Sequence, residues 1–345
     1  MLDLEQGKIT LAHGAGGEQS AELLTSLIYP IFNSEQLELQ EDQARFSLTK
    51  LQTLGDKLAF TTDSYVISPL QFKGGDIGKL AVCGTLNDLA VGGARPMYLS
   101  VGLILEEGLP LKMLRDVLQS MALAAAEAGV EIVTGDTKVV PRGMADQLFI
   151  NTSGIGVIPS GIDWRANAIQ QGDCILINGS IGDHGAAVAD SRGELGLSSD
   201  IVSDCANLYP LVEKLQQALI QVRCMRDATR GGVAAVLNEF AEASGSHLQL
   251  DESALPFGAG VLAVCEMLGF DPLNLANEGK FLMVVPPEEA DRALEVLRAH
   301  PLGRAAAIIG DVPESYRGGM VSLRNALGSA RIVDRPVGEL LPRIC

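Results

Sequence analysis

The order of the apolar segments constrains the fold of this chain more than any other feature of the sequence. Period-2 and continuous apolar patterns predict strands at residues 58–62, 98–105, 130–133, 148–158, 174–178, 247–250, 281–285 and 305–309. Helical periodicity predicts helices over residues 22–31, 77–90, 114–125, 211–222, 233–241 and 288–300. Strands and helices do not alternate strictly, as a doubly wound parallel sheet requires. Two α+β domains are therefore predicted.

The length of the chain agrees with two separate cores, since 345 residues exceed the usual size of one domain. Residues 159–172, rich in glycine, proline and polar residues, form the expected connection between the halves. We expect an N-terminal segment with a glycine-rich loop over 1–40, an N-terminal domain over 41–160, a C-terminal domain over 161–312 and a flexible tail over 313–345. The polar residues 34–54 predict a loop with an edge strand.

Charge and hydropathy exclude two classes of partner. The chain has 26 lysine and arginine residues against 43 acidic residues, a net charge of −17, so it should repel nucleic acid. The first residues include Asp3 and Glu5 where a secretory signal would be basic, and no apolar run is long enough to cross a bilayer. We expect a soluble, cytoplasmic protein without a membrane partner.

Three isolated aspartates occupy unusual places in this pattern. Asp63 and Asp136 follow apolar strand segments and are expected at strand ends, where a side chain is well placed for a ligand. Asp88 follows Asn87 in a largely apolar helix, where a carboxylate needs a partner or a metal ion, although a helix-ending cap would also explain it. Convergence of such acids on Mg²⁺ is common in phosphate chemistry, but spacing alone does not establish it.

Two glycine-containing segments are candidates for phosphate contacts. The cluster that includes Gly14, Gly16 and Gly17 matches neither the P-loop nor the dinucleotide pattern, so a flexible turn and a phosphate-covering loop stay equally open. The second segment begins at Arg226 and includes Arg230 directly before a helix. Free N–H groups and the positive end of the helix dipole, next to two arginines, favour a phosphate site there.

Six cysteines are scattered without a C-x-x-C pair, which argues against a zinc site or a disulfide framework. Five lie in or beside apolar runs and are expected to be small core residues. Cys345 differs, because it ends a Pro-Arg-Ile-Cys sequence in a loose segment and its thiol could travel. By itself this cysteine is more simply explained as an accident of where the chain stops. His184, beside a glycine turn, is a candidate base that more often caps or packs.

Taken together, several segments give the chain a family resemblance. They are the glycine cluster from His13 to Gly17 and the segments 61–66, 74–82, 87–90, 135–138, 226–232 and 342–345. In this order they resemble the HypE family of hydrogenase maturation factors, in the superfamily of aminoimidazole ribonucleotide synthetase and selenophosphate synthetase. The resemblance implies that superfamily's two-domain fold. It also implies a homodimer whose N-terminal strands form a barrel-like sheet, with ATP and Mg²⁺ between the glycine-rich segment and the acidic loops.

The resemblance further implies a function. Cys345 would receive a carbamoyl group from the carbamoyltransferase HypF, and ATP-dependent dehydration would convert it to a thiocyanate. Its cyanide would pass to iron on a HypC–HypD complex during assembly of a nickel-iron hydrogenase. The implied base is Glu278 with Lys138, and the implied Mg²⁺ ligands are Asp63, Asp88, Asp136 and Asp227. The implied nucleotide-binding residues are Gly14, Gly16, Gly17, Asp63, Lys79, Asn87, Asp136, Arg226, Thr229 and Arg230.

Two alternatives stay open. One is another amide- or selenide-activating ATP enzyme of the same superfamily, although no cysteine precedes Cys83 to serve as the early nucleophile of a selenophosphate synthetase. The other is a nucleotide-sensing scaffold whose tail docks partners and carries no group. Replacement of Cys345 separates these readings, because a scaffold would keep its function.

Overall fold

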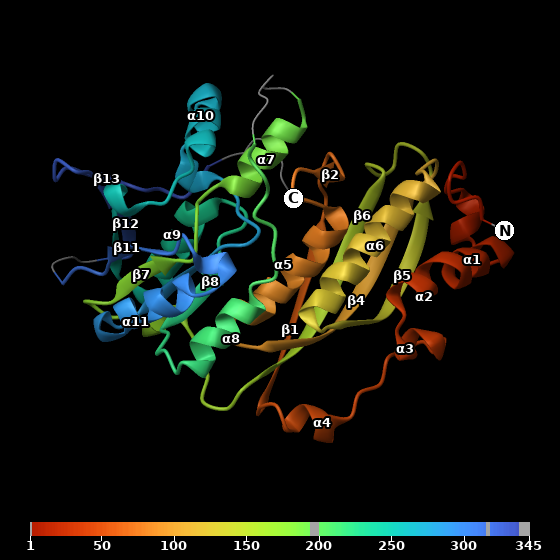
Figure 1. Cartoon of the computed structure of the whole chain (residues 1–345), viewed down its shortest axis with the longest axis horizontal. Helices are drawn as coiled ribbons and strands as arrows, with labels where there is room; N and C mark the ends of the chain where they lie inside the picture. The colour runs from red at the N-terminus through yellow and green to blue at the C-terminus, as the bar shows by residue number, and fades with distance from the viewer. Residues whose placement is uncertain (1, 194–199, 315–317, 338–345) are drawn as a thin grey trace.

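The computed structural model describes residues 2–193, 200–314 and 318–337. Two sheets, each covered by helices, lie on either side of the long helix α5 (Ile77–Val91), as Figure 1 shows. The predicted α+β class and two-domain organisation are confirmed. In the described part of the chain, no helix is both long and apolar enough to span a membrane.

The N-terminal sheet has the strand order β1-β6-β4-β5, in which only β4 and β5 are parallel. Its inward side chains pack against α5 and α6, whose residues Leu114 and Met121 are fully buried. The strands are β1 (Lys57–Tyr65), β4 (Arg95–Glu106), β5 (Glu131–Val140) and β6 (Leu148–Ile158), beside the hairpin β2 (Gln71–Phe72) and β3 (Gly75–Asp76). The other helices are α1 (Glu18–Leu23), α2 (Tyr29–Phe32), α3 (Glu35–Glu38), α4 (Leu48–Gln52) and α6 (Leu111–Ala128). A π-helical turn over Leu24–Ile28 joins α1 to α2.

The C-terminal sheet has the order β13-β12-β9-β11-β7-β10-β8. Helix α9 packs on one face, whereas α8 and α11 pack on the other. Its strands are β7 (Cys174–Ile177), β8 (Cys224–Asp227), β9 (His247–Asp251), β10 (Phe281–Val285), β11 (Ala307–Asp311), β12 (Met320–Arg324) and β13 (Ala330–Ile332). Its helices are α7 (Asp183–Ser191), α8 (Tyr209–Gln217), α9 (Gly232–Ser244), α10 (Ala259–Leu268) and α11 (Pro287–Arg298).

Helix α5 joins the two domains because it is apolar around almost its whole circumference. A helix that is hydrophobic on every side must be buried on every side. One side of α5 packs against β1, β6 and α6, and the other contacts α8 and β8. Asp76 caps its first turn by accepting hydrogen bonds from the N–H groups of Gly78 and Lys79. The side chain of Asn87 on α5 lies at the domain junction, where it contacts the segment around Ala206 and Leu208.

Three local expectations are wrong or incomplete. Asp63 and Asp136 lie inside β1 and β5, because pairing continues past them to Tyr65↔Ile150 and Glu106↔Val140. Residues 34–54 hold the short helices α3 and α4 and no strand. Residues 320–332, placed in the tail by the sequence, form β12 and β13. Strand β12 pairs in parallel with β9, a contact between distant segments that local pattern cannot reveal.

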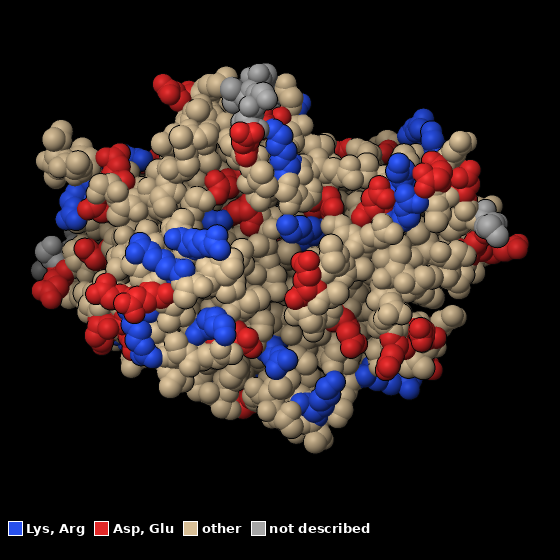
Figure 2. Space-filling view, viewed as in Figure 1, with Lys and Arg blue, Asp and Glu red and all other residues tan. Residues whose placement is uncertain are grey.

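Charges on the face shown in Figure 2 are interspersed, and on this face of the described chain lysine and arginine form no continuous basic surface. Together with the net charge of −17, this pattern gives a polyanion no extended surface to follow on this side of the molecule.

Candidate functional site

Acidic side chains from three elements meet in one cavity at the domain junction. The cavity has a volume of ≈190 Å³, and we call it the acid cavity. Strand β1 supplies Asp63, helix α5 supplies Asp88 and the end of β8 supplies Asp227. Glu278 comes from the loop before β10. The complete lining is Thr62, Asp63, Ser64, Tyr65, Gly84, Asp88, Asp227, Thr229, Arg230 and Glu278.

This cavity brings together six of the residues singled out from the sequence. They are Asp63, Asp88, Asp227, Thr229, Arg230 and Glu278. The acids are held by few direct contacts. Thr61 Oγ1 donates to Asp88 Oδ2 at 2.8 Å, and Arg230 Nη2 lies 3.8 Å from Asp63 Oδ1. The side chain of Arg230 is 70% exposed, so it can reorient toward an anion in the cavity.

Asp88, Asp227 and Glu278 have raised pKa values. Burial raises the pKa of Asp88, and burial together with the charge of Asp88 raises the pKa of Asp227 to about 7. Burial, followed by the charge of Asp227, raises the pKa of Glu278 well above its usual range. Each shift means that ionisation is unfavourable among these neighbours. A cation bound in this cavity would make ionisation of these carboxyl groups more favourable. The carboxylate oxygens therefore suit a cation that is also held by other ligands.

Asp227→Asn is expected to stabilise the nucleotide-free protein at pH 8 by about 2–4 kcal/mol. The folded pKa of Asp227 lies near 7 and its ordinary value is 3.8, so the folded state loses stability as the pH rises between these two values, and the full loss persists above the higher one. The gain should shrink as the pH falls from 7 toward 4 and vanish below the ordinary value, where the carboxyl group is protonated in both states. Urea unfolding at pH 8, 6 and 4.5 measures this difference. A less stable variant at pH 8 would contradict it.

Asp173→Asn is the matched control for this experiment. Asp173 is also buried, but it accepts a hydrogen bond from the Gln170 N–H at 2.7 Å and pairs with Arg223 at 3.2 Å. Its loss leaves these donors without a carboxylate, so this variant should be less stable than the parent at pH 8.

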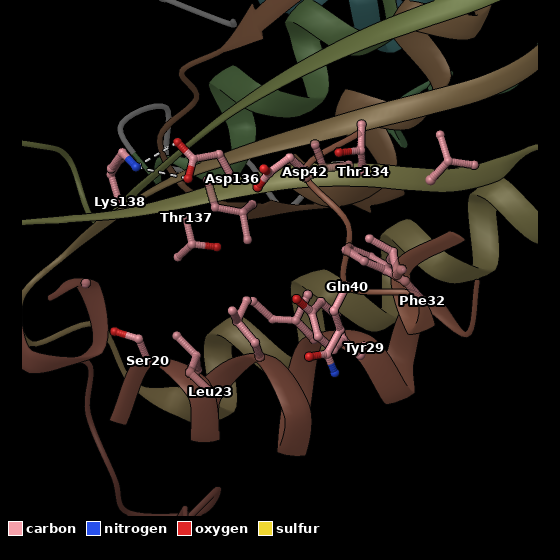
Figure 3. A pocket seen from close by; sticks show the side chains of 18 of the residues that line it. Ser20, Leu23, Tyr29, Phe32, Gln40, Asp42, Thr134, Asp136, Thr137 and Lys138 are labelled. Atoms are coloured by element: carbon pink, nitrogen blue, oxygen red, sulfur yellow. Dashed lines mark hydrogen bonds and ion pairs between the residues drawn. The ribbon is translucent and has the colours of Figure 1, made fainter. Parts of the chain in front are cut away.

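A second cavity, which we call the glycine-loop cavity, lies between the N-terminal helices and β5, with a volume of ≈440 Å³ (Figure 3). Gly14 and Gly16 line it, and β5 contributes Asp136 and Lys138, whose charged groups pair at 2.9 Å. A Cβ atom at Gly14 would come within 2.8 Å of Val139 Cβ, so glycine allows the loop to pack on β5. Leu23, Tyr29 and Phe32 give this cavity an apolar wall (Figure 3).

Within one chain, Asp136 and Lys138 do not join the acid cavity. Strands β1 and β5 are the two edges of the four-stranded sheet. Asp63 therefore lies about 14 Å from the matching position on β5, three strand spacings away. The residues proposed for one nucleotide site are thus divided between two cavities.

Other residues singled out from the sequence lie outside both linings. Asn87 Nδ2 donates to the carbonyl groups of Ala206 and Glu278, and its Oδ1 accepts from the Leu208 N–H. Asn87 therefore supports the wall of the acid cavity. Lys79 Nζ donates to the Gly74 carbonyl at 3.0 Å.

Gly17 precedes α1 as its N-cap, and Arg226 pairs with Glu239. His184 is buried against Phe72, and its Nδ1 lies 2.8 Å from Ser203 Oγ, which agrees with a packing role. Cys345 lies outside the described residues.

Sequence reasoning missed several residues of these cavities. Asp42 lines the glycine-loop cavity on the same side as Asp136 (Figure 3), but its polar surroundings in the sequence gave no signal. Tyr65 lines the acid cavity, where burial and then the charge of Asp63 raise the pKa of its phenol well above 10. A Cβ at Gly84 would overlap the Tyr65 hydroxyl, so glycine is needed there. The requirement for glycine at this position cannot be predicted from the sequence, because it depends on how α5 packs on β1.

Both domains match known protein families. Residues 41–158 match the family described as AIR synthase related protein, N-terminal domain, and residues 170–321 match its C-terminal domain. The carbamoyl dehydratase HypE of Escherichia coli K12 is 53% identical, over 98% of this chain and 99% of that protein.

Solved structures agree. A crystal structure of HypE in complex with ATP has a TM-score of 0.91 at 46% identity, covering 97% of this chain and 99% of that one. A HypE–HypF complex has a TM-score of 0.78 at 45% identity, covering 91% of this chain and 99% of that one. The matched region covers both domains. The chain belongs to the HypE family of AIR synthase related proteins.

Proposed function

We propose that this protein is an ATP-dependent carbamoyl dehydratase that converts a carbamoyl group on the thiol of Cys345 to a thiocyanate. The observation that carries the proposal is the acid cavity, where Glu278 is buried among Asp63, Asp88 and Asp227 beside Arg230. A glutamate with a raised pKa can accept a proton near neutral pH. The relatives named carbamoyl dehydratase HypE support the choice of reaction.

The path of the described chain supports delivery of Cys345 to this cavity. Asn238 on α9 donates to the Val333 carbonyl at 2.9 Å, and Pro336 lies 3.7 Å from the place of a Cβ at Gly231. Gly231 directly follows Thr229 and Arg230, which line the acid cavity. The eight residues after Val337 can span at most about 26–29 Å. We propose that this reach lets Cys345 enter the cavity of its own chain.

The reaction removes water from an S-bound carboxamide. Oxide is a poor leaving group, so the amide oxygen must first be esterified by the γ-phosphate of ATP. Arg230 lies where it can hold phosphate charge, and the N–H groups at the start of α9 add positive potential. Glu278 would take the nitrogen protons as phosphate leaves. Lys138 is our second candidate for proton transfer and phosphate charge.

ATP and Mg²⁺ fit the residues present. A HypE relative has been crystallised with ATP, and here Gly14 and Gly16 adjoin an apolar wall that suits a purine. Among the described residues, no three His, Cys, Asp or Glu side chains are close enough to hold a metal ion unaided. Mg²⁺ is usually held by one or two carboxylates together with phosphate oxygens, so Asp63, Asp88, Asp136 and Asp227 remain suitable ligands. When bound, Mg²⁺ would neutralise phosphate charge.

A homodimer would reconcile the two separate cavities. The outer face of the N-terminal sheet exposes Leu58, Phe60 and Ile104, with Phe60 70% exposed. An apolar face of this kind marks an interaction site. We propose that it pairs with the same face of a second copy in a barrel-like arrangement. Asp136 and Lys138 of one copy would then complete the acid cavity of the other.

Phe60→Asp is expected to convert the protein to a monomer, because it places a charge in the centre of this apolar face. Size-exclusion chromatography with light scattering measures the mass. Leu123→Asp on α6 is the control, since Leu123 is also exposed but lies on the opposite side of the domain. A dimeric Phe60→Asp protein, or a monomeric parent, would contradict the proposed interface.

The partners follow from the chemistry. A HypE–HypF complex among the relatives supports HypF as the source of the carbamoyl group. We propose that a HypC–HypD complex receives the cyanide for the iron of a nickel-iron hydrogenase. Transfer of the cyano group from sulfur to iron as cyanide consumes two electrons, and we propose that the acceptor complex supplies them.

Intact mass spectrometry tests the proposed function. The protein is incubated with HypF, carbamoyl phosphate and ATP, separated from HypF, and then given Mg-ATP. The expected result is a carbamoyl adduct that loses the mass of one water only when ATP is present. Loss of water without ATP, or a stable adduct with ATP, would reject the dehydratase.

A further inference from the structure

The loop that carries Glu278 is tied down by a buried aspartate outside the cavity. Asp204 Oδ1 accepts a hydrogen bond from the Glu278 N–H at 3.0 Å, and its Oδ2 accepts from the Gly279 N–H at 3.3 Å. Lys280 Nζ lies 2.9 Å from the same Oδ2, and both side chains are almost fully buried. One carboxylate thus binds three consecutive residues. Although burial opposes ionisation, the charge of Lys280 lowers the pKa of Asp204, so it is a carboxylate at neutral pH.

Close contact leaves this loop little freedom. A Cβ at Gly279 would overlap the Asp204 carbonyl, so the two backbones touch where Glu278 enters the cavity. From the other side, Asn178 donates to the Gly279 carbonyl at 3.1 Å and accepts from the Phe281 N–H at 2.8 Å. The direction of the Glu278 side chain is therefore fixed by contacts to its backbone.

Asp204 lies in a segment that crosses the domain junction. Residues 201–208 contact the N-terminal domain through hydrogen bonds. Ser203 N–H donates to the Lys73 carbonyl, and Leu208 N–H donates to Asn87 Oδ1, each at 2.8 Å. Asn87 precedes Asp88 on α5. The segment thus fixes the Glu278 loop relative to the helix that carries Asp88.

We propose that Asp204 is a positioning residue for dehydration, which holds the Glu278 carboxyl at the reacting group across the domain junction. This inference rests on the proposed function of Glu278. It assigns no contact between Asp204 and substrate, since Asp204 does not line the acid cavity. The expected consequence of its loss is misplacement of the base. A small misplacement can slow a reaction about 100-fold without preventing substrate binding.

The test removes both charges of the buried pair, because Asp204→Asn alone would leave Lys280 without its carboxylate partner. The carbamoylated double variant Asp204→Asn/Lys280→Gln is mixed with Mg-ATP, and water loss is followed by mass at several ATP concentrations. We expect the maximal rate to fall about 10- to 100-fold, while the ATP concentration for half-maximal rate stays within about threefold.

Asp173→Asn/Arg223→Gln is the matched control. This pair is also buried on its acidic side and binds backbone, but neither residue lines the acid cavity. The control variant should lose about as much stability against urea as the Asp204 double variant does. It should nevertheless keep the parental rate of water loss. The inference is overturned if the maximal rate of water loss falls by the same factor in both double variants. It is also overturned if the Asp204 double variant keeps the parental maximal rate, or if only the ATP concentration for half-maximal rate changes in it.

Glu278→Gln, measured in parallel, separates this inference from the proposed function. If Glu278→Gln keeps the parental rate, the assignment of the base fails and the inference fails with it. If Glu278→Gln is inactive while the Asp204 double variant keeps the parental rate, the base stands and the positioning role alone is rejected.

Discussion

A Cys345→Ala protein is expected to form no carbamoyl adduct with HypF, carbamoyl phosphate and ATP, and therefore to show no water loss. The loss should be complete, because the substrate is carried by this sulfur atom and alanine offers no nucleophile. Binding of ATP should persist, since the two cavities are formed by residues far from position 345 in the sequence. Intact mass and calorimetric titration with Mg-ATP measure the two properties.

The other thiols should not substitute for Cys345. Burial raises the pKa of Cys174 and Cys224, and it raises the pKa of Cys265 to about 11. Thiols are poor nucleophiles when protonated, so these cysteines are unreactive at neutral pH. Cys174→Ala, which changes the partly exposed cysteine of β7, is the control and should be carbamoylated like the parent. An adduct on the Cys345→Ala protein would reject Cys345 as the residue that carries the carbamoyl group.

The sequence predicted the elements of the acid cavity better than their arrangement. Asp88 correctly indicated a special environment, because the apolar residues that surround it along α5 are visible in the sequence and predict a helix with little exposure to water. The glycines and arginine before α9 likewise marked a helix start. Convergence of Asp63, Asp88 and Asp227 followed only from the family resemblance, since it depends on which strands and helices pack together.

What the sequence could not predict depends on contacts between distant segments. The separation of Asp63 from Asp136 follows from the strand order, which period-2 patterns do not specify. The link between Asp204 and Glu278 joins residues 74 positions apart. Asp204 belongs to no motif in the sequence, and its role is evident only when the buried partner Lys280 is located. Such positioning contacts are set by tertiary structure.

Replacing Glu278 by glutamine is expected to lower the rate of water loss about 10²- to 10⁴-fold, the usual contribution of a general base. Glutamine has nearly the same shape, so the loop contacts of Asp204 and Asn178 should persist, and so should ATP binding. In the parent, the rate should rise with pH through the raised pKa of Glu278, because burial favours its neutral form and only the carboxylate accepts a proton. This acidic limb should therefore lie above the usual range for glutamate and disappear in the variant.

Glu289→Gln is the matched control for Glu278→Gln, because Glu289 is also buried but lies on α11, where it pairs with Arg292 at 3.4 Å. Its rate and pH profile should equal those of the parent. The decisive comparison is the carbamoylated Glu278→Gln protein with Mg-ATP. If it loses water at the parental rate, the proton acceptor must be another group, and Lys138 from a second copy becomes the leading candidate. If it binds ATP and retains the intact carbamoyl group, the substitution has abolished dehydration without preventing ATP binding. The acid cavity would then be the place where the thiocyanate forms.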